Sequence, residues 1–246
     1  MNPEDVRIAA RAARAAAEVL VELRAGGLEG RALGDAGDAG AQQAILGVLT
    51  AERPDDVVFS EEATDDRRRL SADRVWIVDP LDGTREYGDP ERHDWAVHVA
   101  LWSAGELTAA AVGLPALGEV HVPDPAPAVP PGTGDGPRIA VSRTRAPAVA
   151  TTVEDALGGK LVPLGSAGYK VLAVVRGEVD AYVHAGGMYQ WDSAAPVAVA
   201  RAAGLTTCRL DGSPLVYNEP DPWLPDLVVC RPALAGPILA AVRSAS

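Results

Sequence analysis

An apolar strand that runs directly into an acidic turn is the feature that most constrains how this chain can fold. Residues 74–78 (RVWIV) are followed at once by residues 79–84 (DPLDGT). Val, Ile and Trp favour a buried strand, and the proline and glycine of the second segment favour tight turns. Two further apolar runs, 95–102 and 107–114, flank an Ala-Gly pair and predict a hairpin. The sequence therefore predicts an antiparallel sheet with carboxylates at the end of one strand.

The rest of the chain indicates two halves of mixed α/β character. Residues 122–137 are rich in proline and glycine and predict an exposed connection between residues 1–121 and residues 138–246. Helices and strands alternate in the second half, which predicts a layered arrangement. Outside the hairpin we expect helices at 3–28, 39–51, 146–157, 167–176 and 192–203, and strands at 57–59, 138–142, 160–163, 181–184 and 227–230.

Charge and apolar content disfavour several classes of function. The formal net charge is −12, which opposes binding to nucleic acids and to anionic membranes. No stretch approaches the roughly 20 apolar residues of a membrane span, and charges throughout the N-terminal segment argue against a signal peptide. Cys208 and Cys230 lack the spacing of a metal or redox motif, so we expect buried thiols in a cytoplasmic protein. A small anionic substrate would be repelled unless bound cations reversed the charge of its site.

Three acid-bearing segments offer ligands for such cations. They are Ser60-Glu61-Glu62, the DPLDGT turn and Trp191-Asp192-Ser193, each beside an expected strand or helix end. Mg²⁺ binds a few carboxylate oxygens together with water and phosphate oxygens. The three segments therefore predict a site for a hard divalent cation.

The DPLDGT turn by itself can bring metal, water and phosphate together. Asp79 and Asp82 can point to one side of the turn, where Leu81 presents its backbone carbonyl. Thr84 stands at the expected start of a helix, where its hydroxyl can orient a water and free N–H groups can receive a phosphate. Each acid taken singly also fits a turn, a helix N-cap or a solvated loop. The joint presence of all three segments favours the metal site.

These segments resemble the signatures of the inositol-monophosphatase superfamily. Residues 76–84 (WIVDPLDGT) are similar to its W-I-x-D-P-[IL]-D-G-T motif, residues 191–196 (WDSAAP) to its W-D-x-A-A-x segment, and Ser60-Glu61-Glu62 to its G-E-E. The motifs follow the family's order along most of the chain. The resemblance implies the layered αβαβα sugar-phosphatase fold, with an α+β half and an α/β half. It also implies a phosphatase that uses Mg²⁺, about two or three ions per site, and is inhibited by Li⁺.

The resemblance further implies roles for individual residues. The metal ligands would be Glu61, Asp79, Asp82, Asp192 and the carbonyl of Leu81. The attacking water would be oriented by Thr84, Glu61 and Asp38, although the segment before Asp38 lacks the family's usual Lys-x-Asp approach. The substrate contacts would come from Gly83, Thr84, Ser166, Lys170 and Asp192.

Other segments are similar to the CysQ-type nucleotidase branch of the superfamily. Arg85-Glu86-Tyr87 resembles its [KR]-E-[FY] motif, and residues 165–170 (GSAGYK) resemble its G-S-x-x-x-K loop. Residues 94–101 and 184–187 are close to actinobacterial members of that branch. The branch implies hydrolysis of 3′-phosphoadenosine 5′-phosphate to AMP and phosphate in sulfur assimilation, with the related sulfated nucleotide as a second substrate.

Two other functions stay open at the level of sequence. One is a broader sugar phosphatase that acts on inositol phosphates or fructose 1,6-bisphosphate. The other is a non-catalytic protein that binds nucleotides or phosphate, although intact acids in all three segments favour catalysis. A homodimer is common among such relatives, but no apolar pattern in the sequence identifies an interface.

Overall fold

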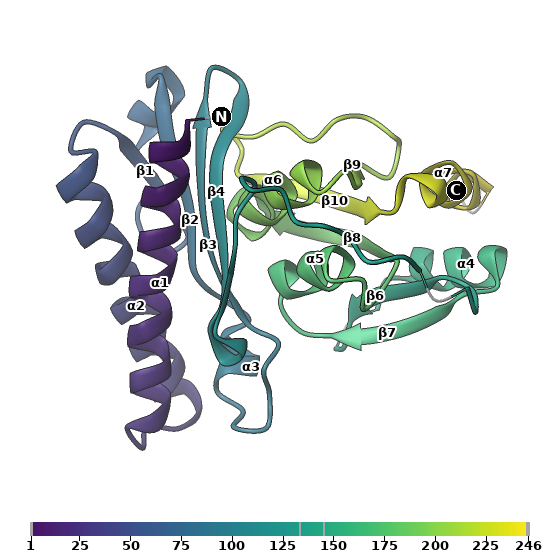
Figure 1. Cartoon of the computed structure of the whole chain (residues 1–246), viewed down its shortest axis with the longest axis horizontal. Coiled ribbons are helices and arrows are strands. Elements are labelled where there is room, and N and C mark those ends of the chain that lie inside the picture. Colours follow the sequence, from purple (N-terminus) through teal and green to yellow (C-terminus); the bar gives the residue numbers. More distant parts are fainter. Residues whose placement is uncertain (1, 133, 145, 245–246) are drawn as a thin grey trace.

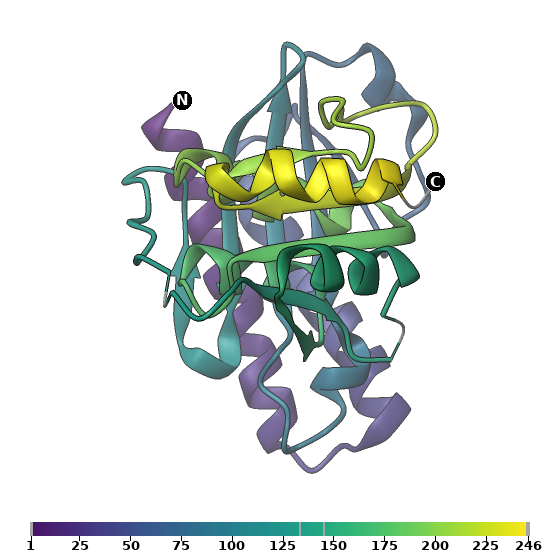
Figure 2. The ribbon, with the colours of Figure 1, turned by 90° about the vertical axis from the view of Figure 1, so that its right-hand side faces the viewer.

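Helices and sheets alternate in layers through the molecule. The computed structural model describes residues 2–132, 134–144 and 146–244. Along the long axis the order is helices, sheet, helices, sheet, helices (Figure 1). Each half of the chain supplies one five-stranded sheet, and the strands of the two sheets run in crossing directions (Figure 2). This is the layered αβαβα arrangement expected from the sequence.

The first sheet is covered on its outer face by two long helices. The α1 helix (Pro3–Ala25) turns an alanine-rich stripe toward the strands, and small side chains allow this close packing. The α2 helix (Gly30–Glu52) lies beside it. The strands, in pairing order, are β1 (Val57–Ser60), β2 (Arg74–Asp82), β3 (Ala96–Ser103), β4 (Glu106–Leu114) and β5 (Glu119–His121), with short helices η1 (Arg67–Ser71), α3 (Thr84–Tyr87) and η2 (Pro115–Leu117) between them.

One edge of this sheet differs from the expected antiparallel pairing. The predicted β3–β4 hairpin is present, but β1 runs parallel to β2, with Ser60 opposite Val78. The segment that carries η1 crosses over between them and returns the chain in the same direction. The parallel pairing has a consequence for the site, because Glu61 and Asp79 follow these paired residues and emerge at the same end of neighbouring strands.

The α2 helix begins at Gly30, well before the start predicted at residue 39. Glycines in this stretch lower its helix propensity, which is why the sequence pattern missed it. Packing explains the helix instead: a Cβ at Gly34 would lie 2.8 Å from Thr84 Cγ2, and one at Gly37 would lie 2.7 Å from Tyr87 Cε1. The missing side chains let α2 approach α3 closely, and Asp38 is therefore held on a helix.

The second sheet pairs in the order β7-β6-β8-β10-β9. The helix predicted at residues 192–203 begins later than expected, because Asp192 belongs to a separate 3-10 turn before it. Strand β9 and the C-terminal helix α7, which contains Pro237, were not expected from the sequence. The elements are β6 (Arg138–Ser142), α4 (Ala148–Leu157), β7 (Lys160–Leu164), α5 (Ala167–Val175), β8 (Ala181–Tyr189), η3 (Gln190–Asp192), α6 (Ala194–Ala202), β9 (Thr206–Cys208), β10 (Trp223–Cys230) and α7 (Pro232–Ser244).

The α5 and α6 helices fill the space between the two sheets, and both are almost entirely buried. The α4 and α7 helices cover the outer face of the second sheet (Figure 2). Cys208 and Cys230 are free and buried, as expected. Of the helices described, none combines the length and apolar character needed to cross a bilayer.

Candidate functional site

Three carboxylates from separate parts of the chain meet where the two halves face each other. Glu61 follows β1, Asp79 is buried near the end of β2, and Asp192 closes the η3 turn just before α6. Each offers one oxygen atom, and these atoms all lie within 4.8 Å of one another. The Glu61 amide donates to the Val78 carbonyl at 3.3 Å, which fixes the two N-terminal acids side by side.

The electrostatics of this cluster favour a bound cation. Desolvation and the charges of Asp82 and Glu61 raise the pKa of Asp79 well above its usual range. Desolvation, followed by the charge of Asp82, raises the pKa of Asp192 to about 8. The same two causes raise the pKa of Glu61 to about 7. Like charges held this close in a desolvated site need a positive partner.

One oxygen of the cluster has no partner of its own. Within the described part of the chain, Asp79 Oδ2 is buried without a hydrogen bond, whereas Oδ1 accepts from the Leu81 amide at 3.0 Å. Buried carboxylate oxygens are normally hydrogen-bonded, so an exception in the middle of an acidic cluster fits a metal ligand. The residues present therefore suit a divalent cation on both charge and donor chemistry.

Asp82, also predicted as a ligand, lies outside this group of three. Its Oδ2 accepts hydrogen bonds from the Ser166 hydroxyl and from the Gly168 amide, the latter at 2.6 Å. This oxygen therefore joins the end of β2 to the first turn of α5. A sequence pattern could not show this, because the donors lie more than eighty residues further along the chain.

Thr84 and Asp38 meet at the junction of α2 and α3. The Thr84 hydroxyl donates to the Leu81 carbonyl at 3.2 Å. Burial and the charges of Glu62 and Asp35 raise the pKa of Asp38 to about 6, and a hydrogen bond with the Thr84 side chain partly offsets this rise. The structure thus brings together the Thr84–Asp38 pair that the sequence predicted only by resemblance.

The turn before α5 forms the opposite wall of the site. Ser166 caps the helix by accepting from the Tyr169 amide at 2.9 Å, and it has a positive φ of 48°. Gly83, with φ of 92°, lies against it, where a Cβ would be 3.2 Å from Ser166 Cβ. Lys170, which is buried, donates from Nζ to the carbonyls of Gly165 and Ser166. Its ammonium group therefore holds the turn together and also borders the cavity.

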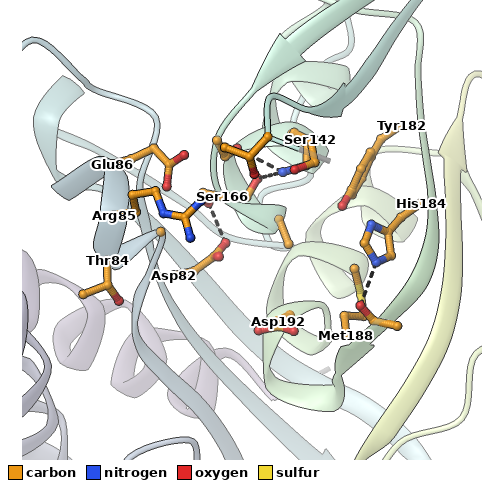
Figure 3. A pocket seen from close by; sticks show the side chains of 16 residues that line it. Asp82, Thr84, Arg85, Glu86, Ser142, Ser166, Tyr182, His184, Met188 and Asp192 are labelled. Atoms are coloured by element: carbon orange, nitrogen blue, oxygen red, sulfur yellow. Dashed lines mark hydrogen bonds between the residues drawn. The ribbon is translucent and has the colours of Figure 1, made fainter. Parts of the chain in front are cut away.

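A cavity of about 390 Å³ opens between these walls and extends away from the carboxylates. Asp82 and Thr84 line one side and Asp192 lies at its lower end, as Figure 3 shows. The C-terminal half adds Tyr182, His184 and Met188, none of which the sequence predicted as site residues. Tyr182 and His184 alternate along β8, and that period of two is the signal that places them on one face.

An ion-pair network supports two residues that line the cavity, Glu86 and Gly165. Asp94, which is buried, pairs with Arg92 at 2.6 Å and with Arg143 at 2.7 Å. It also accepts from the Gly165 amide at 2.5 Å. Arg143 approaches Glu86 at 3.6 Å. These contacts connect the loop before β3 to the turn before α5, so the two halves are locked across the site.

Known proteins are similar to this chain over most of its length. A family model described as the inositol monophosphatase family matches residues 3–122 and 137–245. A Mycobacterium leprae protein named 3′-phosphoadenosine 5′-phosphate phosphatase is 51% identical over 253 residues, covering 97% of this chain and 93% of that protein. A Mycobacterium tuberculosis protein of the same name is 54% identical over 224 residues, covering 87% of this chain and 83% of that protein.

Solved structures share the fold. CysQ from Bacteroides thetaiotaomicron, described as a bacterial member of the inositol monophosphatase family, superposes with a TM-score of 0.80 at 24% identity. The superposition covers 93% of this chain and 97% of that one. Because the family model also matches nearly the whole sequence, this chain belongs to the inositol monophosphatase family.

Proposed function

We propose that this protein is a Mg²⁺-dependent phosphatase that removes the 3′-phosphate of 3′-phosphoadenosine 5′-phosphate, giving AMP and phosphate. The supporting observation is the carboxylate cluster of Glu61, Asp79 and Asp192 beside a cavity of about 390 Å³. Relatives about half identical in sequence carry the name of this activity. A pocket of this size lies within the range of small-molecule sites, roughly 300–1,000 Å³.

The metal ligands proposed are the three clustered carboxylates, the Leu81 carbonyl and Asp82 through Oδ1. The second oxygen of Asp82 is already occupied by Ser166 and Gly168, which would hold Oδ1 toward the cluster. Bound Mg²⁺ would neutralise the phosphate charge and make a water more acidic. The family implies divalent metal use, and the choice of Mg²⁺ is part of this proposal.

The residues around the cluster would position the reacting groups. Asp38 and Glu61 accept hydrogen bonds from the attacking water, and Thr84, anchored by its contact with Asp38, holds that water in line with the phosphorus atom. The amides of Gly83 and Thr84 donate to the phosphate oxygens. A P–O bond forms to the water oxygen as Asp38 or Glu61 accepts the proton that the water releases, the P–O3′ bond breaks, and a proton from solvent reaches the departing 3′ oxygen.

The cavity walls would receive the rest of the nucleotide. Asp192 lies at the boundary between the cluster and the cavity, where a ribose hydroxyl would be placed. Lys170 borders the cavity with an ammonium group whose third N–H is suited to an anionic substituent. Ser166, whose hydroxyl donates to Asp82, would contact the substrate as part of the cavity wall. Tyr182 and Met188 offer an aromatic ring and a flexible thioether to a flat base.

The test compares phosphate release from three substrates: 3′-phosphoadenosine 5′-phosphate, inositol 1-phosphate and fructose 1,6-bisphosphate. Each is measured with Mg²⁺, with EDTA, and with Mg²⁺ plus Li⁺. We expect fast, chelator-sensitive release from the nucleotide and a much lower kcat/KM for both sugar phosphates. A preference for either sugar phosphate would move the protein to the broader phosphatases. No release from any of the three would favour a binding protein.

A further inference from the structure

A fully buried histidine contacts the two segments that carry Asp79, Asp82 and Asp192, which are the end of β2 and the η3 turn. His98 lies on β3 directly opposite Asp79 of β2. Its Nδ1 is 3.1 Å from the Trp191 carbonyl oxygen, the residue before Asp192. Its Nε2 is 3.4 Å from Asp82 Oδ2, and Nδ1 is 3.8 Å from Asp79 Oδ2. One imidazole ring therefore touches the segments of Asp79, Asp82 and Asp192.

The surrounding chain leaves space for this ring. A Cβ at Gly168 would lie 1.9 Å from His98 Nε2, so only glycine permits the observed contact. The Gly168 amide donates to Asp82 Oδ2, the same oxygen that His98 faces. The start of α5, the imidazole ring and the Asp82 carboxylate thus form one packed unit.

A packing role alone does not account for His98. Ala96 and Ala100, which share its face of β3, are fully buried apolar residues, and an apolar side chain would avoid the cost of burying a polar ring. In the described part of the chain, His98 Nε2 and Asp79 Oδ2 are both buried without a hydrogen bond. Buried polar atoms without partners are rare, and two of them on facing residues of β2 and β3 indicate a role beyond packing.

We propose that His98 is a positioning residue that sets the spacing of the metal-binding carboxylates. It holds the Trp191 carbonyl, and therefore the η3 turn with Asp192, against the end of β2. It also packs against Asp82 Oδ2 at 3.4 Å and adds to the hydrogen bonds from Ser166 and Gly168 that fix the orientation of this carboxylate. Groups that orient metal ligands typically change metal affinity by about 10–100-fold when they are removed. This inference rests on the metal site proposed above.

The experiment measures the Mg²⁺ dissociation constant of the full chain by isothermal titration calorimetry, using Mg²⁺ alone. His98→Leu fills the space but removes both contacts, and we expect affinity to fall by about tenfold or more. His98→Asn retains a polar group near the Nδ1 position, and His98→Gln retains one near the Nε2 position. We expect each to recover part of the loss. The Mg²⁺ concentration for half-maximal activity should rise in the same order.

His121→Leu is the matched control. His121 lies on β5 of the same sheet, pairs with Glu119 at 2.8 Å and is distant in sequence from every acid of the cluster. We expect its Mg²⁺ affinity to equal that of the unchanged protein. Folded His98 variants that all bind Mg²⁺ with unchanged affinity would overturn the inference. If His98→Leu does not fold, the Asn and Gln variants decide by the same criterion. An unchanged protein that binds no Mg²⁺ would instead overturn the proposed metal site.

Discussion

The two walls of the site differ in how their charged groups are paired. The metal side, which consists of Glu61, Asp79 and Asp192, holds carboxylates with raised pKa values and one buried oxygen without a partner. The substrate side, which consists of residues 165–170 with Asp94 and Arg143, is internally paired. The carboxylates of the metal side need a bound cation to balance their charge. The charged groups of the substrate side already have partners within the folded chain. Binding energy and folding energy are therefore divided between the two walls of the site.

The largest expected effect comes from the metal side. Asp79→Asn removes a ligand while keeping the shape, so we expect kcat with Mg²⁺ to fall by about 10³-fold or more, equivalent to roughly 4 kcal/mol. The metal-free variant should be as stable as the unchanged protein or more so, because it loses a repelled buried charge. Phosphate release and thermal denaturation in EDTA measure both. A variant that is inactive because it unfolds would contradict the contrast drawn here.

Asp82→Asn tests a residue that belongs to both walls. It keeps acceptor capacity for Ser166 and Gly168 but loses its charge. We expect the protein to remain folded and Mg²⁺-dependent turnover to be lost, by about 10²-fold or more. Turnover assays and circular dichroism report the two properties separately. Unchanged turnover would remove Asp82 from the proposed metal site.

The pH dependence of metal binding sharpens the comparison. The raised pKa values mean that the folded carboxyls of Glu61 (about 7) and Asp192 (about 8) keep protons that the unfolded chain has already released near pH 4. The metal-free fold therefore loses stability as pH rises from about 4 to 8. Because Mg²⁺ displaces these protons, affinity should rise by about tenfold or more between pH 6 and 8. Calorimetry at several pH values measures this, and a flat profile would contradict it.

A change on the substrate side should act on stability and substrate affinity together. Asp94→Ala leaves Arg92 and Arg143 without their shared partner and frees the Gly165 amide. We expect the free energy of unfolding to fall by about 2 kcal/mol, because the two arginines remain partly hydrated. KM should rise more than kcat falls, since the turn before α5 loosens. Unfolding curves in urea and steady-state kinetics measure the two effects. An unchanged free energy of unfolding or an unchanged KM would contradict this expectation.

The smallest effects are expected within α2. Gly47 has open space around it, so Gly47→Ala should add up to about 1 kcal/mol of stability with unchanged activity. Gly34→Ala gains the same helix propensity but places a methyl group 2.8 Å from Thr84 Cγ2. We expect little net change in its stability and a loss of kcat of about tenfold, because Thr84 moves relative to the cluster. Equal activity of the two variants would show that the close approach of α2 does not matter.

The sequence by itself determined the local features of this protein. A run of Val, Ile and Trp before DPLDGT identified β2, the Ala104-Gly105 pair identified the β3–β4 hairpin, and the acids at positions 61, 79 and 192 were recognised together. These features depend on residues close together in the sequence. The apolar pattern of a strand and the residue preferences of a turn can be recognised within such a short segment. Resemblance to known motifs then supplied the family, which the comparisons confirmed.

Only the tertiary structure decided the long-range features. Helix propensity argued against a helix at residues 30–38, but packing of α2 on α3 outweighs it. The parallel pairing of β1 and β2 placed Glu61 beside Asp79, and an amide in the first turn of α5 donates a hydrogen bond to one oxygen of Asp82. The position of His98 among the acids depends on the register of two strands and on one distant glycine. Such contacts join residues far apart in the chain, and no local pattern encodes the distance between them.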